Sequence, residues 1–435
     1  MASSTSALRQ VGIYRNLPII DDTLEGLAAI VTGANGISGF NMMRALLESP
    51  KRWKKVFCLS RRPPPEEMMA LLPREARSRI HFVSCDFLSE PASIAEALTT
   101  AGVHANYIFF YSYVHKQWSE ADALVESNVL LLQNFLQALE LAKIKPDRFI
   151  LQTGGKNYGV HIGRTTVPLL ESDPQPKHLE PSFYYIQEDL VKAFCQKQNS
   201  SWSVIMPCAV IGASSQAAMN GFYLFGVYAA VQTHKGEPLE FGGDWESWQF
   251  ENYHCSARMT GFLTEWVALT PHGCNEKFNT QDGGPLTLER FFNELARWYG
   301  ASGVVPPPDD ESDMANQTFG TSGKLAPLGY GPPLSYKARF TLEDWAKDEK
   351  NVAAWREMME ISRGKLIHDP FAIPDGFYMA RFAYCRTASP CLNKARRLGW
   401  TGFVDTMESI FEAFVEMAKL GMLPEMRVQF ARPLC

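Results

Sequence analysis

Residues 27–62 read LAAIVTGANGISGFNMMRALLESPKRWKKVFCLSRR, and this stretch decides the fold. It opens on an apolar run without helical periodicity, which predicts a buried strand. Gly33, Gly36 and Gly39 follow at regular spacing, and apolar residues at helical spacing come after them. A strand, a glycine turn and a helix in this order indicate a dinucleotide-binding unit, because the glycines permit a tight turn, the approach of a pyrophosphate and close packing of the helix. Backbone N–H groups at the start of the helix would then hold the phosphates.

The second strand, predicted at residues 55–59, ends in Ser60, Arg61 and Arg62. An enzyme that prefers NAD usually carries an acid here, which bonds the ribose 2′-hydroxyl. Two guanidinium groups suit a 2′-phosphate instead, since charge-assisted bonds of this kind are strong. We therefore predict NADP(H) as the cofactor. The alternative is a chance glycine pattern followed by a solvated turn.

The composition is that of an ordinary globular chain of 435 residues, with 46% hydrophobic residues and a net charge of −5. The mildly acidic balance argues against nucleic acid as a partner. The nine cysteines are scattered without metal-ligand spacing, so we expect reduced thiols and no metal site. No secretory signal is evident, and the longest apolar run, residues 222–231, is too short to span a bilayer. We expect a cytoplasmic protein without a membrane span.

Further strands alternate with helical patterns along the first half of the chain. They are predicted at residues 80–84, 106–110, 148–152 and 202–206. This alternation predicts an α/β fold, a doubly wound parallel sheet over residues 27–210 that forms the NADP-binding domain.

The rest of the chain is less regular. Residues 1–26 are interpreted as an irregular N-terminal arm, and residues 211–435 as a mainly helical substrate-binding lobe, partly interleaved with the first domain. Long helices are predicted at residues 340–361 and 403–420. An apolar helix at 217–231 is expected either between the lobes or in a homodimer contact.

A reductase of this architecture usually needs a tyrosine, with a cation beside it that lowers the tyrosine pKa. The usual Tyr-x-x-x-Lys arrangement is absent, because Glu188 stands four residues after Tyr184 and Asp189 four after Tyr185. Lys156, just past the fifth strand, can reach a tyrosine at the start of the next helix through space. The alternative is a surface lysine in a loop and an aromatic helix start that packs on the sheet.

Five motifs in order resemble the progesterone 5β-reductase/iridoid synthase-like (PRISE) family of atypical extended short-chain dehydrogenases/reductases. They are residues 33–39 (GANGISG), 61–63 (RRP), 85–86 (CD), 153–158 (TGGKNY) and 183–189 (FYYIQED). The likeness continues through residues 202–204, 227–230 and 392–400, and it covers nearly the whole chain except the N-terminal arm.

The resemblance implies a Rossmann domain and NADPH-dependent reduction of a C=C bond conjugated to a carbonyl group. It assigns Lys156 and Tyr184 to the enolate oxygen, with Tyr185 as the fallback. Asn157 stands where the family has histidine, and Met206 stands where many relatives have arginine. These departures concern the substrate more than the cofactor. Similar sequences are frequent in fungal secondary metabolism, which implies a small apolar enone as substrate.

The motifs and the resemblance together define the candidate site. Lys156 and Tyr184 are the catalytic candidates. Asp86 either bonds the adenine amino group or caps the segment after it. The cofactor-binding candidates are Gly33, Asn35, Gly36, Ile37, Gly39, Ser60, Arg61, Arg62, Asp86, Phe87, Tyr113, Gln152, Thr153, Gly154, Tyr184, Pro207 and Val210.

Two other functions use the same fold. One is an NADPH-dependent ketone or aldehyde carbonyl reductase that uses the same tyrosine and lysine. The other is a non-redox cyclase or isomerase that keeps the nucleotide fold. A sugar-nucleotide epimerase fits less well, because that group generally keeps Tyr-x-x-x-Lys.

Overall fold

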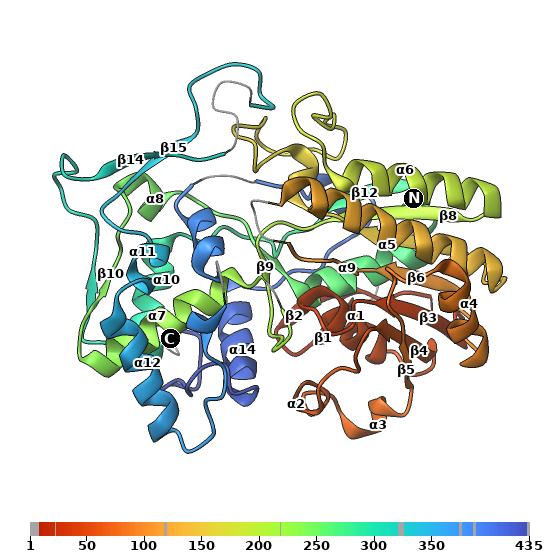
Figure 1. Cartoon of the computed structure of the whole chain (residues 1–435), viewed down its shortest axis with the longest axis horizontal. Helices are drawn as coiled ribbons and strands as arrows, with labels where there is room; N and C mark the ends of the chain where they lie inside the picture. Colours follow the sequence, from red (N-terminus) through yellow and green to blue (C-terminus); the bar gives the residue numbers. More distant parts are fainter. Residues whose placement is uncertain are drawn as a thin grey trace.

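The computed structural model describes residues 8–21, 23–116, 120–217, 219–320, 326–373, 376–385 and 389–432. Its centre is a parallel sheet of seven strands in the order β12-β8-β7-β6-β3-β4-β5 (Figure 1). The strands, in that order, are Glu276–Asn279, Ser201–Met206, Arg148–Gln152, Tyr107–Phe110, Leu27–Thr32, Trp53–Ser60 and Ile80–Ser84. The predicted doubly wound sheet is confirmed.

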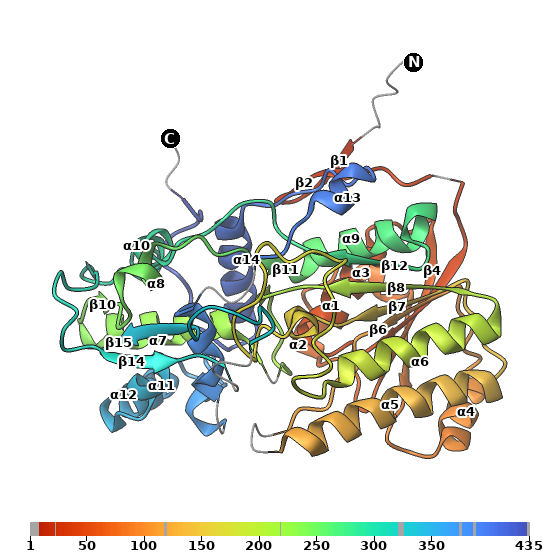
Figure 2. The same cartoon turned by 90° about the horizontal axis from the view of Figure 1, so that it is seen from above.

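Helices cover both faces of the sheet, and Figure 2 shows the two layers from above. One face carries α4 (Pro91–Thr100), α5 (Ala121–Leu141) and α6 (Phe183–Gln198). The other carries α1 (Ile37–Leu47) and α9 (Ala257–Leu269), which pack on each other. Each face therefore buries its own set of strand side chains, which is why these strands read as apolar runs.

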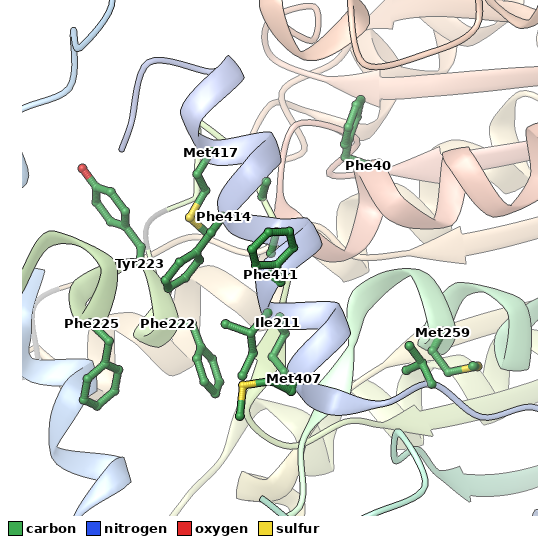
Figure 3. Packing of buried hydrophobic residues seen from close by; sticks show 14 of the residues in the cluster. Phe40, Ile211, Phe222, Tyr223, Phe225, Met259, Met407, Phe411, Phe414 and Met417 are labelled. Atoms are coloured by element: carbon green, nitrogen blue, oxygen red, sulfur yellow. The ribbon is translucent and has the colours of Figure 1, made fainter. Parts of the chain in front are cut away.

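The second lobe is built mainly from helices and continues the core over α1 and α9. Its main helices are α7 (Gly221–Lys235), α8 (Trp245–Gln249), α10 (Leu288–Tyr299), α11 (Leu342–Ala346), α12 (Glu349–Ile361) and α14 (Thr406–Lys419). Figure 3 shows part of this packing, in which Phe411 and Phe414 of α14 and Phe222 of α7 belong to one buried cluster. The apolar character of α7 thus reflects burial inside this chain.

Short elements complete the fold. The small pairings are β10 (Leu239–Glu240) with β13 (Val304–Val305), β9 (Val210–Ile211) with β11 (Cys255–Ser256), and β14 (Ala315–Thr318) with β15 (Ser335–Ala338). The remaining helical turns are α2 (Glu66–Met69), α3 (Arg74–Arg77), α13 (Asn393–Arg397), η1 (Gly155–Tyr158), η2 (Pro271–Gly273), η3 (Pro370–Ala372) and η4 (Gly376–Ala383).

The N-terminal arm was predicted to be irregular, but it forms a hairpin of β1 (Leu8–Val11) and β2 (Tyr14–Pro18). Tertiary contacts fix it: the Tyr14 hydroxyl donates to Glu412 at 2.7 Å, and Arg15 pairs with Glu408 on the same helix, α14. The prediction failed because these partners come from the other end of the chain.

The prediction of one long helix at residues 340–361 was also wrong, because α11 and α12 are separate helices. Thr341 and Asp344 form a capping box that starts α11, and the Asp348 side chain accepts from the Lys350 N–H to start α12. The helix predicted at residues 403–420 is α14, which begins after Asp405.

A buried ion pair joins the two lobes. Arg44 on α1 meets Glu416 on α14 through Nη2–Oε1 at 2.6 Å and Nη1–Oε2 at 2.9 Å. The side chains are only 8% and 11% exposed. The helix that follows the glycine turn is therefore locked to the second lobe by charge as well as by apolar packing.

Candidate active site

The glycine turn lies where the strand order reverses, between β3 and β6. Gly33 has φ +60°, and a Cβ there would lie 2.8 Å from the Tyr111 carbonyl oxygen. A Cβ on Gly39 would lie 2.3 Å from the Gly33 carbonyl oxygen, so only glycine lets α1 start this close to the strand. Gly36 precedes Ile37, the first residue of α1. The first N–H groups of a helix lack partners within it, and here they face the edge where open sheets bind ligands.

Asn35 and Ser60 join the glycine turn to the arginine turn. Asn35 Nδ2 donates to the carbonyl oxygen of Arg62 at 2.9 Å, and Ser60 Oγ donates to the same oxygen at 2.7 Å. The Arg61 and Arg62 side chains are exposed at the end of β4. The turn is held by its backbone, which leaves both guanidinium groups available to an anion.

The candidate residues that follow β5 and β6 differ in their burial and in their contacts. Asp86 Oδ1 accepts from the Leu88 N–H at 3.0 Å, so this carboxylate caps its own turn and is exposed. The Phe87 ring packs on Phe135 at 4.7 Å inside the core. Tyr113 is half-buried, and burial raises the pKa of its phenol to about 12.

The end of β7 presents polar atoms that no residue in the described ranges satisfies. Gln152 Nε2 donates to Ser38 Oγ at 2.8 Å, but Gln152 Oε1 and Thr153 Oγ1 are buried without a protein partner in that part of the chain. Buried polar atoms of this kind need an explanation, and a bound ligand is one. With the glycine cradle, these atoms fit a dinucleotide laid along the sheet edge.

Lys156 stands in η1, directly after β7. Its side chain is half-buried, and burial lowers its pKa to about 8, an effect opposed by Glu180. His161 pairs with Glu180 at 3.5 Å, and burial followed by the nearby Lys156 lowers the His161 pKa to about 3. Lys156, Glu180 and His161 thus share one neighbourhood. The prediction missed the last two, because nothing in the sequence brings loop residues on both sides of a long connection together.

Tyr184 and Tyr185 open α6 and face different neighbours. The Tyr184 hydroxyl oxygen lies 3.5 Å from where a Cβ on Gly154 would be, at the end of β7. Burial, then Tyr113 and Cys208, raise the pKa of the Tyr184 phenol, contrary to the lowering expected from a cation.

The Tyr185 side chain turns to acidic neighbours instead. Its hydroxyl is buried without a partner among the described residues, and burial, then Glu180 and Glu188, raise its pKa to about 12. Tyr184 is therefore the tyrosine beside the strand end, whereas Tyr185 shares Glu180 with Lys156.

Pro207 and Val210 follow β8. The Pro207 carbonyl oxygen accepts from the Gly155 N–H at 3.2 Å and so fixes the start of η1. Val210 pairs with Cys255 between β9 and β11 and is half-buried. Both lie on the segment that follows the strand next to β7.

A hollow of about 640 Å³ lies elsewhere. It is lined by Trp202 at the start of β8 and by Asn275, just before β12, so it opens at the opposite end of the strands. It is not part of this site.

Two further features bear on the class of protein. No helix in the described ranges has the length and apolar character needed to cross a bilayer. Within the same ranges, no group of three or more histidine, cysteine or acidic side chains is arranged so that it could bind a metal ion. The cysteines described by the structure are free thiols.

Comparison with known proteins places this geometry in a family. A family model described as a PRISE-like Rossmann-fold domain matches residues 29–318. An uncharacterized protein of Schizosaccharomyces pombe is 31% identical over 420 residues, which cover 92% of this chain and 99% of that protein. A short chain dehydrogenase of Penicillium aethiopicum is 28% identical over 405 residues, 91% of this chain and 99% of the relative.

Two more distant likenesses are informative. A 3-oxo-Delta(4,5)-steroid 5-beta-reductase of Arabidopsis thaliana is 27% identical over 280 residues, covering 62% of this chain and 69% of that protein. The solved structure of an epimerase from Methanothermobacter thermautotrophicus has a TM-score of 0.53 at 17% identity, covering 78% of this chain and 95% of its own. At this identity the structural likeness shows the fold alone.

Proposed function

Since this chain belongs to the PRISE-like Rossmann-fold family, and is thus an oxidoreductase of the short-chain dehydrogenase/reductase class, we propose that it is an NADPH-dependent reductase of a C=C bond conjugated to a carbonyl group. The proposed substrate is a small apolar enone or enal of secondary metabolism. The name of the Arabidopsis relative describes reduction of such an enone, which supports this choice for the chain that resembles it.

The observation that carries the proposal is the meeting of two segments at the end of β7. The Tyr184 hydroxyl lies beside Gly154, and Lys156 follows Gly154 by two residues. The raised pKa of Tyr184 keeps the phenol protonated at neutral pH, so it can donate a hydrogen bond. A Lys156 pKa of about 8 leaves the amine mostly charged at neutral pH.

These two groups suit the charge that develops when an enone is reduced at its β-carbon. Bound NADPH would supply the hydride. As the electrons move to the carbonyl oxygen, Tyr184 donates a hydrogen bond to the resulting enolate oxygen and the Lys156 ammonium stabilises the negative charge. A proton from water then adds to the α-carbon and gives the saturated carbonyl compound. A standard arrangement would put the cation on α6 at position 188, but a carboxylate stands there, so the cation comes from η1.

The preference for NADPH rests on Arg61 and Arg62. We expect Arg61→Ala with Arg62→Ala to lower kcat/KM for NADPH by about tenfold or more, as the loss of a charged hydrogen bond implies, and to leave the value for NADH nearly unchanged. Equal effects on both cofactors would contradict the 2′-phosphate assignment.

The function is tested by NADPH oxidation with a panel of enones and enals, including cyclohexenone and methyl vinyl ketone, with identification of each product. We expect a saturated carbonyl compound. An allylic alcohol would instead identify a carbonyl reductase, and a rearranged product without NADPH oxidation would identify a cyclase or isomerase.

The residue roles are tested in the same assay. Lys156→Met and Tyr184→Phe should each retain NADPH binding, measured by its fluorescence, and lower turnover about a hundredfold or more. Tyr185→Phe is the matched control and should stay within a few-fold of the wild type. Normal turnover of Tyr184→Phe with loss in Tyr185→Phe would move the role to Tyr185.

A further inference from the structure

Glu188 is a buried carboxylate at the position where most short-chain dehydrogenases carry their catalytic lysine. It lies one helical turn after Tyr184 on α6 and is 1% exposed. Burying a charge is unfavourable unless it is paired and hydrogen-bonded, so its partners show what it does.

The partners of Glu188 come from three elements. Glu188 Oε1 accepts from Asn157 Nδ2 at 2.8 Å, and Asn157 is the residue next to Lys156 in η1. Glu188 Oε2 pairs with Lys277 Nζ of β12 at 2.5 Å and with Lys192 Nζ on its own helix at 3.5 Å. The carboxylate therefore joins the helix of Tyr184 to the turn of Lys156.

The same turn has two more anchors. Gln175 Nε2 donates to Asn157 Oδ1 at 2.8 Å, so the Asn157 amide is held on both sides. The Tyr158 hydroxyl donates to Asn279 Oδ1 of β12 at 2.7 Å. Asn157 and Tyr158 are buried, whereas Lys156 is only half-buried. Two consecutive residues thus fix the backbone of η1 beside Lys156, whose half-buried side chain lies near Glu180 and His161.

We propose that Glu188 is a positioning residue that sets the place of Lys156 relative to Tyr184, acting through the Asn157 amide and held in place by Lys277. Glu188 occupies the position on α6 where a catalytic lysine would stand, and through Asn157 it links this helix to Lys156 on η1. Asn157 is suited to this role because its amide donates to Glu188 and accepts from Gln175 at once. This role rests on the proposed function of Lys156 and Tyr184.

The test compares Glu188→Ala, Glu188→Gln and the matched control Asp189→Asn. Asp189 is the next residue on the helix and makes an exposed ion pair with Lys177. We expect Glu188→Ala to lower kcat for enone reduction tenfold or more with an unchanged Kd for NADPH, because small displacements of a catalytic group have effects of this size. Glu188→Gln keeps an acceptor for Asn157 and should recover kcat to within about fivefold. Asp189→Asn should equal the wild type.

Two readouts separate positioning from a general loss of structure. Hydrogen exchange of the peptide covering η1 should quicken in Glu188→Ala and stay at the wild-type rate in Asp189→Asn. In a Lys156→Met background, adding Glu188→Ala should lower kcat by less than about twofold further, because a residue that acts through Lys156 has no effect once Lys156 is gone. Should Glu188→Ala not fold, Gln175→Ala and Asn157→Ala carry the same comparison.

The outcomes are distinct. Wild-type kcat and exchange in Glu188→Ala, or losses that multiply with Lys156→Met, would overturn the positioning role. Unchanged turnover in Lys156→Met would instead refute the catalytic role proposed for Lys156. The exchange rate of η1 then still decides whether Glu188 holds the turn.

Discussion

The ion pair between Arg44 and Glu416 allows a quantitative prediction about the joint between the lobes. Glu416→Gln removes the carboxylate that Arg44 contacts directly, so a guanidinium that is only 8% exposed keeps just the longer-range attraction of Glu412. Breaking a buried pair in this way costs about 3–5 kcal/mol. We expect the free energy of unfolding to fall by this amount.

The corresponding shift in melting temperature follows from the size of the chain. For 435 residues, an unfolding entropy of about 2.1 cal/mol/K per residue gives about 0.9 kcal/mol/K, so the expected shift is about 3–5 °C. Scanning calorimetry measures it directly. Removing both charges in Arg44→Met with Glu416→Leu should restore most of the loss, because neither charge then remains buried.

Glu408→Gln is the matched control, since Glu408 lies on the same helix and pairs with Arg15 at 2.7 Å with side chains that are 37% and 30% exposed. An exposed pair contributes at most about 1 kcal/mol. Equal shifts for Glu416→Gln and Glu408→Gln would refute the reasoning. The reasoning would also be refuted if Arg44→Met with Glu416→Leu lost as much unfolding free energy as Arg44→Met and Glu416→Leu lose in sum when each is made alone.

Two further predictions concern the glycine turn and a buried acid. Gly39→Ala should abolish NADPH binding and lower the melting temperature, because the added Cβ meets the Gly33 carbonyl oxygen at 2.3 Å, whereas Gly284→Ala, where no atom lies within 4 Å, should bind NADPH normally in a fluorescence titration. Burial raises the pKa of Asp282 from 3.8 to about 7, so the folded state binds this proton more tightly than the unfolded state does. The protonated carboxyl therefore stabilises the folded state fully below about pH 4, and this stabilisation is lost as the pH rises through about 7. The free energy of unfolding, measured in urea, should therefore fall relative to Asp282→Asn over this range by up to about 4 kcal/mol, and parallel pH profiles would contradict the shift.

Local signals allowed the first part of the fold to be predicted from the sequence. The glycine motif, the strand before it and the helix after it are neighbours in the chain, and the structure keeps them as β3, turn and α1. The tyrosines of the motif at residues 183–189 were also predicted to lie at the start of a helix, and they do lie at the start of α6, where Ser182 accepts from the Tyr184 N–H. These features depend on residues a few positions apart.

The parts that could not be predicted depend on distant partners. The N-terminal hairpin is held by α14, and its sequence carries no strong strand pattern of its own. Glu188 was visible as an acid that could not activate a tyrosine, but its bond to Asn157 and its pair with Lys277 join three elements. The pairing of His161 with Glu180 across a long connection is of the same kind.

The position of β12 at the border of the sheet has a consequence for dissecting this protein. The strand comes from beyond residue 210, yet it pairs with β8 from Ser203 to Met206. A fragment that stopped at residue 210 would leave β8 as an open edge, and unpaired edges recruit strands from other molecules. We therefore expect that the nucleotide-binding half does not fold on its own, and that its expression alone yields aggregates rather than a smaller enzyme.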